Sequence, residues 1–202
     1  MPVMALTAWF AGMVLALQSA TAFDGMFIEQ SLPRIVSLAL TRELIPVMTG
    51  LMMAGRWGSA MTAELATMRL TEQIDALRTM SVNPFSYLVW PRIVASTLAL
   101  PLLACMGMVI GIAAGGWIVA MRGWMVWELY VQHILSVLTL RDIAGGLVKA
   151  MVFGHVIGWV ATFYGYGAHG GTQGIGRATT QSVVTISVLI FILNYIVSSV
   201  IF

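Results

Sequence analysis

Three ionisable residues, Arg42, Glu43 and Lys149, stand inside long apolar segments of the sequence. An ionised side chain in such surroundings is costly unless it pairs with another group or faces water. Arg42 follows Arg34 by eight residues, and Lys149 follows Arg141 by the same number. On helices, this spacing places both cations roughly 12 Å beyond a basic residue near the start of their segment. If both segments enter the apolar layer from the same face, the three charges reach a common depth.

Two kinds of chemistry fit these charges. The first is structural: Glu43 forms an ion pair with Lys149 or Arg42 and locks two helices together. The second is anion binding, because two cations against one carboxylate leave one positive charge that a phosphate group could neutralise. The residues alone leave both open.

A second group of charges lies in "GRWGSAMTAELATMRLTEQIDALRTM", residues 55–80, which holds six of the 18 charged residues (10 basic and 8 acidic). At 100° per residue, one helix face carries Ala63, Ala66, Leu70, Ile74 and Leu77, and the other carries Glu64, Thr71, Glu72, Asp75 and Arg78. The spacing predicts an amphipathic helix over about residues 59–82. Helices that bind membrane surfaces usually carry Lys and Arg on the polar face, so three carboxylates favour a basic protein partner. A helix on the membrane surface is the alternative.

Enzyme chemistry has weaker support. An intramembrane serine protease could use Ser59 with His155 or His169, but no carboxylate is placed to orient His155. The segment "GYGAHG" satisfies G-x-G-x-x-G but follows an apolar segment instead of a strand, which argues against dinucleotide binding. A lone Cys105 supports no metal site. No G-x-x-x-x-G-K-[ST] occurs, so we expect no cofactor in this chain and ATP and Mg²⁺ bound by another subunit.

The composition indicates the elements that must position these residues. The sequence has 202 residues, of which 59% are hydrophobic and 9% charged, with a mean hydropathy of +0.92. These values are typical of an all-α integral membrane protein. We predict one transmembrane domain over residues 1–202, with five spans at about residues 3–22, 35–54, 93–121, 143–164 and 182–202.

Two segments of this outline have special features. "SATAF" offers a signal-peptidase site after Ala22, but the first residues lack the basic region of a signal peptide, so we expect a span there. The aromatic, amphipathic segment 122–142 is predicted to lie at the membrane interface. Pro46 and Pro101 each interrupt a predicted span and are expected to bend it.

Basic residues predict the orientation. The connections after the second and fourth spans carry Arg56, Arg69, Arg78, Arg92 and Arg177, against Arg34, Arg122 and Arg141 on the other side. The positive-inside rule therefore places residues 55–80 in the cytoplasm.

Small residues recur every four positions on two spans, at Gly107, Gly111 and Gly115 and at Ala150, Gly154 and Gly158. Such spacing lets helices approach closely. We expect contacts within the helix bundle, with a homodimer interface as the alternative.

The stretch "LTRELIPVMTGLMMAGRWGSAMTAELATMRLTEQIDAL", followed by "GIGRATTQSVV", resembles the MlaE permease subunits of Mla/Mce-type ABC lipid transporters. The resemblance covers essentially the whole chain in span order, including the charged "REL-P" span and the "AGR-GSA-TAE" and "MR-TEQ" motifs. It favours a transport subunit over an enzyme. A secondary transporter also fits less well, because no inverted repeat is detectable.

The resemblance implies roles for the residues above. Arg42 and Lys149 would line the lipid path, with Glu43 holding them in place. In the family the helix matching residues 59–82 couples the permease to a cytoplasmic ATPase, so Glu64, Arg69, Glu72 and Asp75 become candidate ATPase-facing residues.

The resemblance also implies a setting. It predicts a multi-pass protein of the bacterial inner membrane that forms a homodimer and works with a cytoplasmic ABC ATPase, a periplasmic MCE-domain ring and a STAS-like protein. The substrate would be phospholipid. One difference concerns the start: the family has an amphipathic segment before its first span, whereas this sequence begins almost directly in that span. We expect a truncated gene model, an artificially trimmed sequence or a shortened member of the family.

Overall fold

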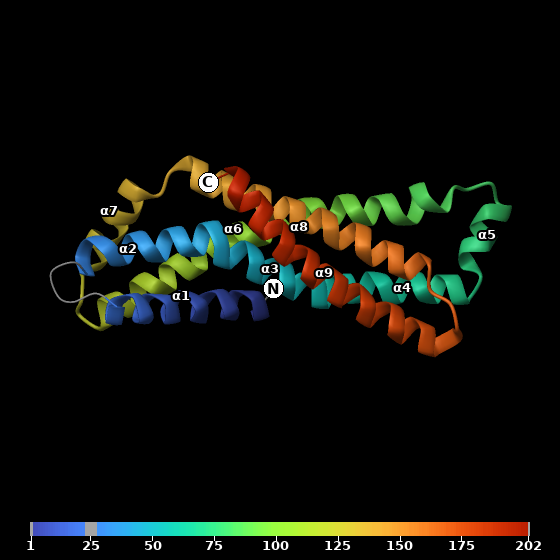
Figure 1. Ribbon diagram of the computed structural model, residues 1–202, viewed down its shortest axis with the longest axis horizontal. Helices are drawn as coiled ribbons and strands as arrows, with labels where there is room; N and C mark the ends of the chain where they lie inside the picture. The colour runs from blue at the N-terminus through green and yellow to red at the C-terminus, as the bar shows by residue number, and fades with distance from the viewer. Residues whose placement is uncertain (1, 23–27, 202) are drawn as a thin grey trace. The chain divides into compact units, whose positions relative to one another are not determined.

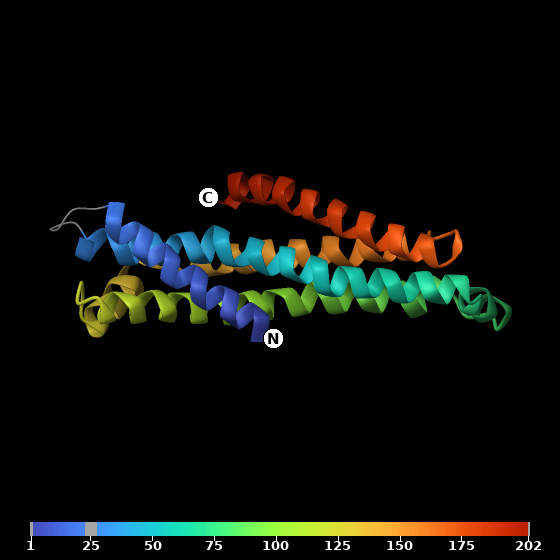
Figure 2. The same ribbon diagram turned by 90° about the horizontal axis from the view of Figure 1, so that it is seen from below.

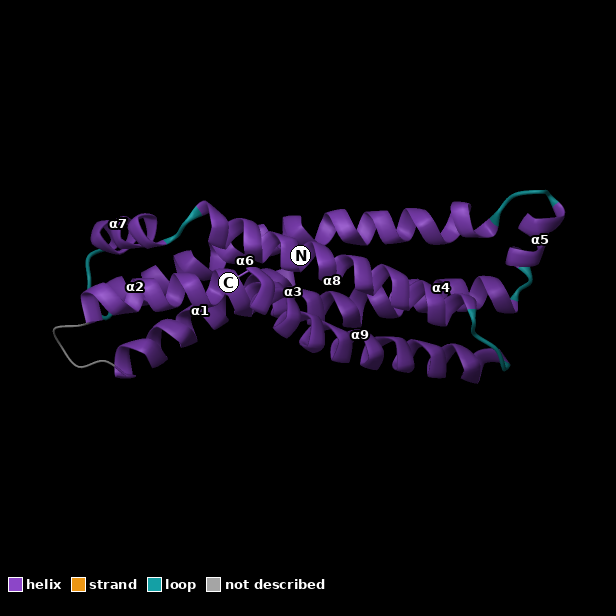
Figure 3. Cartoon of the chain, turned by 45° about the horizontal axis from the view of Figure 1, so that its top comes forward, coloured by secondary structure: helices purple, strands orange, loops and turns teal. Residues whose placement is uncertain are grey.

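The computed structural model describes residues 2–22 and 28–201, and within these ranges every regular element is a helix (Figure 3). The α-helices are α1 (Pro2–Ala22), α2 (Ile28–Ala39), α3 (Ile45–Met53), α4 (Ser59–Leu70), α5 (Gln73–Thr79), α6 (Trp90–Met121), α7 (Trp127–Val137), α8 (Leu140–Tyr166) and α9 (Gly171–Ile201). Three π-helical segments lie between them: η2 (Leu40–Leu44), η3 (Ala54–Gly58) and η4 (Phe85–Val89). The all-α prediction is confirmed.

Five helical stretches of the described chain are long and apolar enough to cross a membrane, which matches the predicted number. They are Pro2–Thr21, Ser31–Leu70, Phe85–Met121, Leu140–Tyr166 and Gly171–Ile201. Several extend beyond the predicted bounds: the second stretch ends at Leu70 instead of near residue 54, and the last begins at Gly171 instead of Ser182. The interfacial segment contains the short helix α7, which is not among the five.

Two prolines explain two of the π-helical segments. Pro46 and Pro91 each follow the end of a π segment, η2 or η4, by two residues. A proline has no N–H group, and its ring clashes with the carbonyl four residues earlier. A wider π turn relieves this clash, and in η2 the Ile45 N–H bonds to the Leu40 carbonyl, five residues back. The helix therefore continues through both prolines.

The predicted single helix over residues 59–82 is wrong in its continuity. It consists of α4 and α5, separated by Thr71 and Glu72, and Glu72 has a left-handed backbone with φ of 58°. On one straight helix, Ile74 would point about 180° away from Leu65, nine residues earlier. The turn allows both side chains to be fully buried. Leu70, predicted on the apolar face, is 46% exposed.

The start of the third span also differs from the prediction. The span was predicted at about residues 93–121, but the helical stretch that contains it begins at Phe85. The preceding helix α5 ends at Thr79, and the Asn83 side-chain oxygen accepts a hydrogen bond from the Phe85 N–H at 3.0 Å. Asn83 thus caps the following helix, where Pro84 occupies a first-turn position that tolerates its missing N–H.

The chain divides into two compact units, and the first comprises residues 1–49 and 102–148. Within it, α2 contacts both α1 and α7, and α7 lies beside α2 in Figure 1. The glycines of α6 lie against its neighbours: a Cβ atom at Gly111 would come within 3.2 Å of the Ala8 carbonyl oxygen, and one at Gly107 within 2.9 Å of Ile45. Gly115 faces Val36 and Tyr130.

The second unit comprises residues 50–101 and 149–202. In it α9 packs along α4 (Figures 1 and 2). The α8 glycines allow close approach to the first part of α6, because a Cβ atom at Gly154 would overlap the Ser96 carbonyl and one at Gly158 would lie 2.8 Å from the Ile93 Cα atom.

A buried threonine joins three helices of the second unit. Thr62 is fully buried on α4, and its hydroxyl oxygen lies 3.1 Å from the Ala161 carbonyl oxygen of α8 and 3.0 Å from the Ser182 hydroxyl of α9. Thr62→Val is expected to lower the free energy of unfolding in detergent by about 1 kcal/mol, as removal of an interhelical hydrogen bond in a membrane does. Thr67→Val is the matched control, because the exposed Thr67 hydroxyl bonds only to its own helix at Ala63. Equal effects of the two substitutions would contradict the prediction.

Candidate substrate and coupling sites

Arg42 pairs with Asp142 in the first unit. The Arg42 Nη2 atom lies 2.6 Å from Asp142 Oδ1, and Nε donates to the same oxygen at 2.8 Å. The Arg42 side chain is 36% exposed and that of Asp142 only 3%. Arg42 lies in η2, so the widened turn next to Pro46 sets the position of this guanidinium. Two donors on one carboxylate give a strong, oriented ion pair.

Asp142 was not identified as a site residue from the sequence. Its other oxygen, Oδ2, accepts hydrogen bonds from the Thr139 backbone N–H at 2.9 Å and the Thr139 hydroxyl at 2.6 Å. Thr139 immediately precedes α8 and Asp142 is the third residue of that helix, which is the arrangement of a capping box. The sequence pattern that could have indicated this capping box is "TLRD", residues 139–142, directly before an apolar segment.

This pair changes the charge count on which the anion-binding hypothesis was based. Arg42, Glu43 and Lys149 alone carry one net positive charge, but Asp142 adds a second carboxylate. Within the first unit, the Asp142 carboxylate therefore balances the charge of Arg42, so Arg42 does not supply the excess positive charge that the hypothesis assumed.

Lys149 lies on α8 in the second unit and is completely buried. Its ammonium nitrogen donates to the Ser198 hydroxyl of α9 at 2.6 Å. Arg42 and Glu43 belong to the first unit, so the predicted convergence of all three at one depth stays a prediction. The structure of the second unit places a cation inside a helix that is long and apolar enough to cross a membrane.

Two of the predicted ATPase-facing residues hold α4 and α5 together. Asp75 Oδ1 accepts from Arg69 Nη1 at 3.3 Å and from Arg78 Nη1 at 3.1 Å, and Arg78 Nη2 also donates to the Tyr166 hydroxyl at 2.7 Å. These bonds attach α5 to both α4 and the end of α8. Glu72 is exposed at the turn, and no ion pair involves it within residues 28–201.

The remaining coupling candidate, Glu64, has a different partner. Its Oε2 atom lies 3.3 Å from Arg92 Nη2, and both residues line a groove between α4 and α6. The Glu64 side chain is 60% exposed and that of Arg92 is 20% exposed. The segment 59–82 therefore contains two chemically different parts: a turn with an exposed carboxylate, and an ion pair beside an apolar groove.

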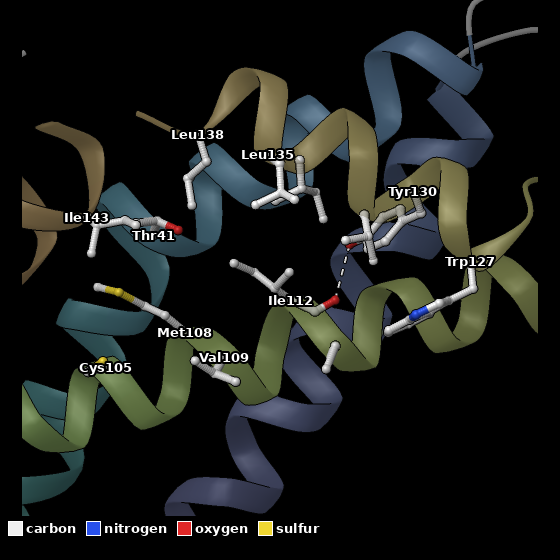
Figure 4. Close-up of a pocket in the computed structure, with 13 residues that line it drawn as sticks. Thr41, Cys105, Met108, Val109, Ile112, Trp127, Tyr130, Leu135, Leu138 and Ile143 are labelled. Carbon is white, nitrogen blue, oxygen red and sulfur yellow. Dashed lines mark hydrogen bonds between the residues drawn. The ribbon is translucent and has the colours of Figure 1, made fainter. Parts of the chain in front are cut away.

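The first unit contains an apolar pocket of about 320 Å³ between α6 and α7 (Figure 4). Met108, Ile112 and Leu138 are among its lining residues, and the Tyr130 hydroxyl donates to the Ile112 carbonyl at 3.2 Å. Burial raises the pKa of the Tyr130 hydroxyl above its usual range. The pocket surface is almost entirely apolar, although the lining residues Thr41, Cys105, Trp127 and Tyr130 carry polar atoms.

The residues considered for enzyme chemistry are not arranged for it. The Ser59 hydroxyl donates to carbonyl groups of its own helix, at Gly55 and Arg56. His155 contacts the Thr97 hydroxyl at 3.3 Å, and His169 is exposed beyond the end of α8. Within the described part of the chain, no group of three or more His, Cys, Asp and Glu residues could hold a metal ion.

Comparison with known proteins finds a matching family model and relatives along nearly the whole chain. The family model "Permease MlaE" matches residues 1–200. A probable ABC transporter permease protein of Rickettsia typhi is 44% identical over 208 residues, covering 100% of this chain and 78% of the relative. A probable ABC transporter permease protein of Synechocystis is 38% identical over 98% of this chain and 75% of its own length.

A third relative is a plant protein. Protein TRIGALACTOSYLDIACYLGLYCEROL 1, chloroplastic, of Arabidopsis thaliana is 37% identical over 96% of this chain and 55% of its own length. The family model and the two bacterial relatives cover nearly all of this sequence. The chain therefore belongs to the MlaE family of ABC transporter permeases.

Proposed function

We propose that this permease moves phospholipid between the bacterial inner membrane and a periplasmic MCE-protein assembly. Its family makes it a multi-pass membrane protein and a transport subunit, not an enzyme. The lipid part of this proposal is supported by the plant relative, whose name contains a galactosylated diacylglycerol lipid. It is also supported by the long apolar helices, which provide an environment for acyl chains.

Lys149 is the observation that carries the proposal for the substrate site. A fully buried ammonium group in a membrane-spanning helix is costly and is typical of substrate pathways. Its hydrogen bond to Ser198 orients it toward α9. In our proposal Lys149 binds the lipid phosphate, and Arg42, held by Asp142, lies on the same path with Glu43.

An ABC transporter permease works with an ATPase subunit. We propose that this subunit alone binds ATP and Mg²⁺, and that it contacts the turn between α4 and α5. We further propose that two copies of this chain form the permease, with an MCE-domain ring on the periplasmic side and a STAS-like protein on the cytoplasmic side.

Lys149→Gln tests the substrate site. In the complex of permease and ATPase, the substitution is expected to lower the amount of copurified phospholipid and the rate of lipid transfer about tenfold, because the phosphate loses its charged donor. Arg177→Gln is the matched control, since it removes one positive charge from an exposed position of the same unit. Unchanged transfer by a folded Lys149→Gln protein would contradict the proposed role.

A further inference from the structure

A groove of about 330 Å³ in the second unit lies between α4 and the first part of α6. Small side chains form its walls, with Ala60 on α4 and Ala95 and Ala99 on α6, and Trp57 and Met61 complete the apolar lining. We call it the Arg92 groove, because the ion pair of Arg92 and Glu64 lies on its wall. It does not involve Lys149 or the apolar pocket of the first unit.

The ion pair leaves Arg92 able to bind another anion. Glu64 contacts Arg92 through one oxygen at 3.3 Å, and the Glu64 side chain is 60% exposed. Because Glu64 is solvent-exposed and the contact is long, this ion pair is expected to stabilise the protein little. The Arg92 Nη1 atom donates to the Leu88 carbonyl at 3.0 Å, which fixes the guanidinium on α6. A guanidinium has five N–H donors and can bind phosphate through two of them at once.

Aromatic side chains place Arg92 at the level of lipid headgroups. Tyr87 and Trp90, just before Arg92, are 65% and 53% exposed. Exposed Tyr and Trp at the end of a membrane-spanning helix lie at the membrane interface. Val94 and Leu98, which follow on the same helix, are exposed apolar residues suited to contact acyl chains.

The groove continues in the direction of the apolar layer. Ala95 and Ala99 lie about 4.5 Å and about 10.5 Å beyond Arg92 along the axis of α6. Their neighbours Val94 and Leu98 are exposed, so the groove opens beside a lipid-facing surface. A charged donor at headgroup level and an apolar channel below it match a phosphate group and its acyl chain.

We propose that the Arg92 groove binds one glycerophospholipid from the membrane leaflet at the α5 end of the protein. The phosphate binds Arg92 in place of Glu64, and one acyl chain lies along Ala95 and Ala99. This site is separate from the proposed transport site at Lys149. Because Glu64 and the phosphate compete for the same guanidinium, removal of the two charges has opposite effects on lipid affinity.

Native mass spectrometry of the 202-residue chain in detergent, titrated with palmitoyl-oleoyl-phosphatidylglycerol, tests the proposal. Arg92→Gln is expected to weaken binding of one lipid about tenfold, and Glu64→Gln to strengthen it about threefold. Ala99→Leu, which fills the groove without changing charge, is expected to weaken binding about tenfold. Arg122→Gln, at an exposed position in the first unit, is the control and leaves the affinity unchanged.

Three outcomes would overturn the proposal: affinity of Arg92→Gln within twofold of the unsubstituted protein, weaker binding by Glu64→Gln, or no effect of Ala99→Leu. Dioleoylglycerol lacks the phosphate group. Its affinity for the unsubstituted protein should therefore be no higher than the affinity of phosphatidylglycerol for Arg92→Gln. The titration is repeated with Lys149→Gln. If Lys149→Gln binds one lipid fewer and Arg92→Gln does not, the proposed transport site is supported and this inference fails. If Arg92→Gln binds one lipid fewer and Lys149→Gln does not, this inference is supported and the transport site is contradicted. Thermal unfolding confirms that each variant is folded.

Discussion

Asp142→Ala is expected to lower the free energy of unfolding by about 2 kcal/mol. The substitution removes a nearly buried carboxylate that pairs with Arg42, but the Arg42 side chain left behind is 36% exposed, so the cost lies between the values for exposed pairs, below about 1 kcal/mol, and for buried pairs, about 3–5 kcal/mol. It also removes the acceptor for the Thr139 N–H at the start of α8. Reversible unfolding of the purified chain in mixed micelles measures the effect.

Two further variants separate the roles of Asp142. Asp142→Asn keeps a side-chain oxygen that accepts from Thr139 but removes the charge. It should therefore lower the free energy of unfolding by about half as much as Asp142→Ala does. Asp75→Ala is the control: this carboxylate also pairs with arginines, but its side chain is 50% exposed, and the expected cost is below about 1 kcal/mol. If Asp142→Ala and Asp75→Ala cost the same, the Arg42–Asp142 pair does not stabilise the first unit as proposed.

The number and order of the long helices could be predicted from hydropathy, because long apolar segments are an averaged property. Their ends could not. Residues 171–176, rich in glycine, were predicted as a connection but form the first turns of α9. Each glycine costs only about 1 kcal/mol in a helix, and packing elsewhere along a long helix can outweigh that cost. Local amino-acid composition is therefore a poor predictor of where these helices begin and end.

The sequence indicated only one partner of the Arg42–Asp142 ion pair. Spacing identified Arg42 as a charge inside an apolar segment, but not its partner Asp142, 100 positions further along the chain. Asp142 lies next to Arg141 at the start of α8, where a charge is easily taken for a solvated helix end. The pairing depends on how the start of α8 lies against η2, and the sequence contains no direct signal of that contact.

Helical periodicity identified a polar surface on residues 59–82 but assumed one straight axis. The turn at Glu72 divides this surface. Asp75 and Arg69 bond across the turn, whereas Glu64 faces Arg92 and the groove. Among the four predicted coupling residues, Glu72 is the exposed carboxylate at the tip of the turn, and no ion pair occupies it within residues 28–201. We therefore expect the strongest coupling effect at Glu72.

Glu72→Lys is expected to lower lipid-stimulated ATP hydrolysis by the complex of permease and ATPase about tenfold. Reversal of an exposed charge at an interface replaces attraction to a basic partner surface with repulsion. The fold should be unaffected, because the side chain lies outside the packed part of the second unit. ATPase activity in proteoliposomes and copurification of the ATPase measure the effect, and the unfolding midpoint checks the fold.

Glu72→Gly distinguishes the charge from the backbone. Glycine adopts the left-handed conformation of position 72 without strain, so this variant removes the carboxylate and retains the turn. It should lower ATP hydrolysis less than Glu72→Lys does. Glu128→Lys, which reverses an exposed carboxylate in the first turn of α7, is the control and should leave hydrolysis unchanged. Full activity of Glu72→Lys would show that coupling does not depend on the charge at this turn, because the substitution alters no other contact of α4 or α5.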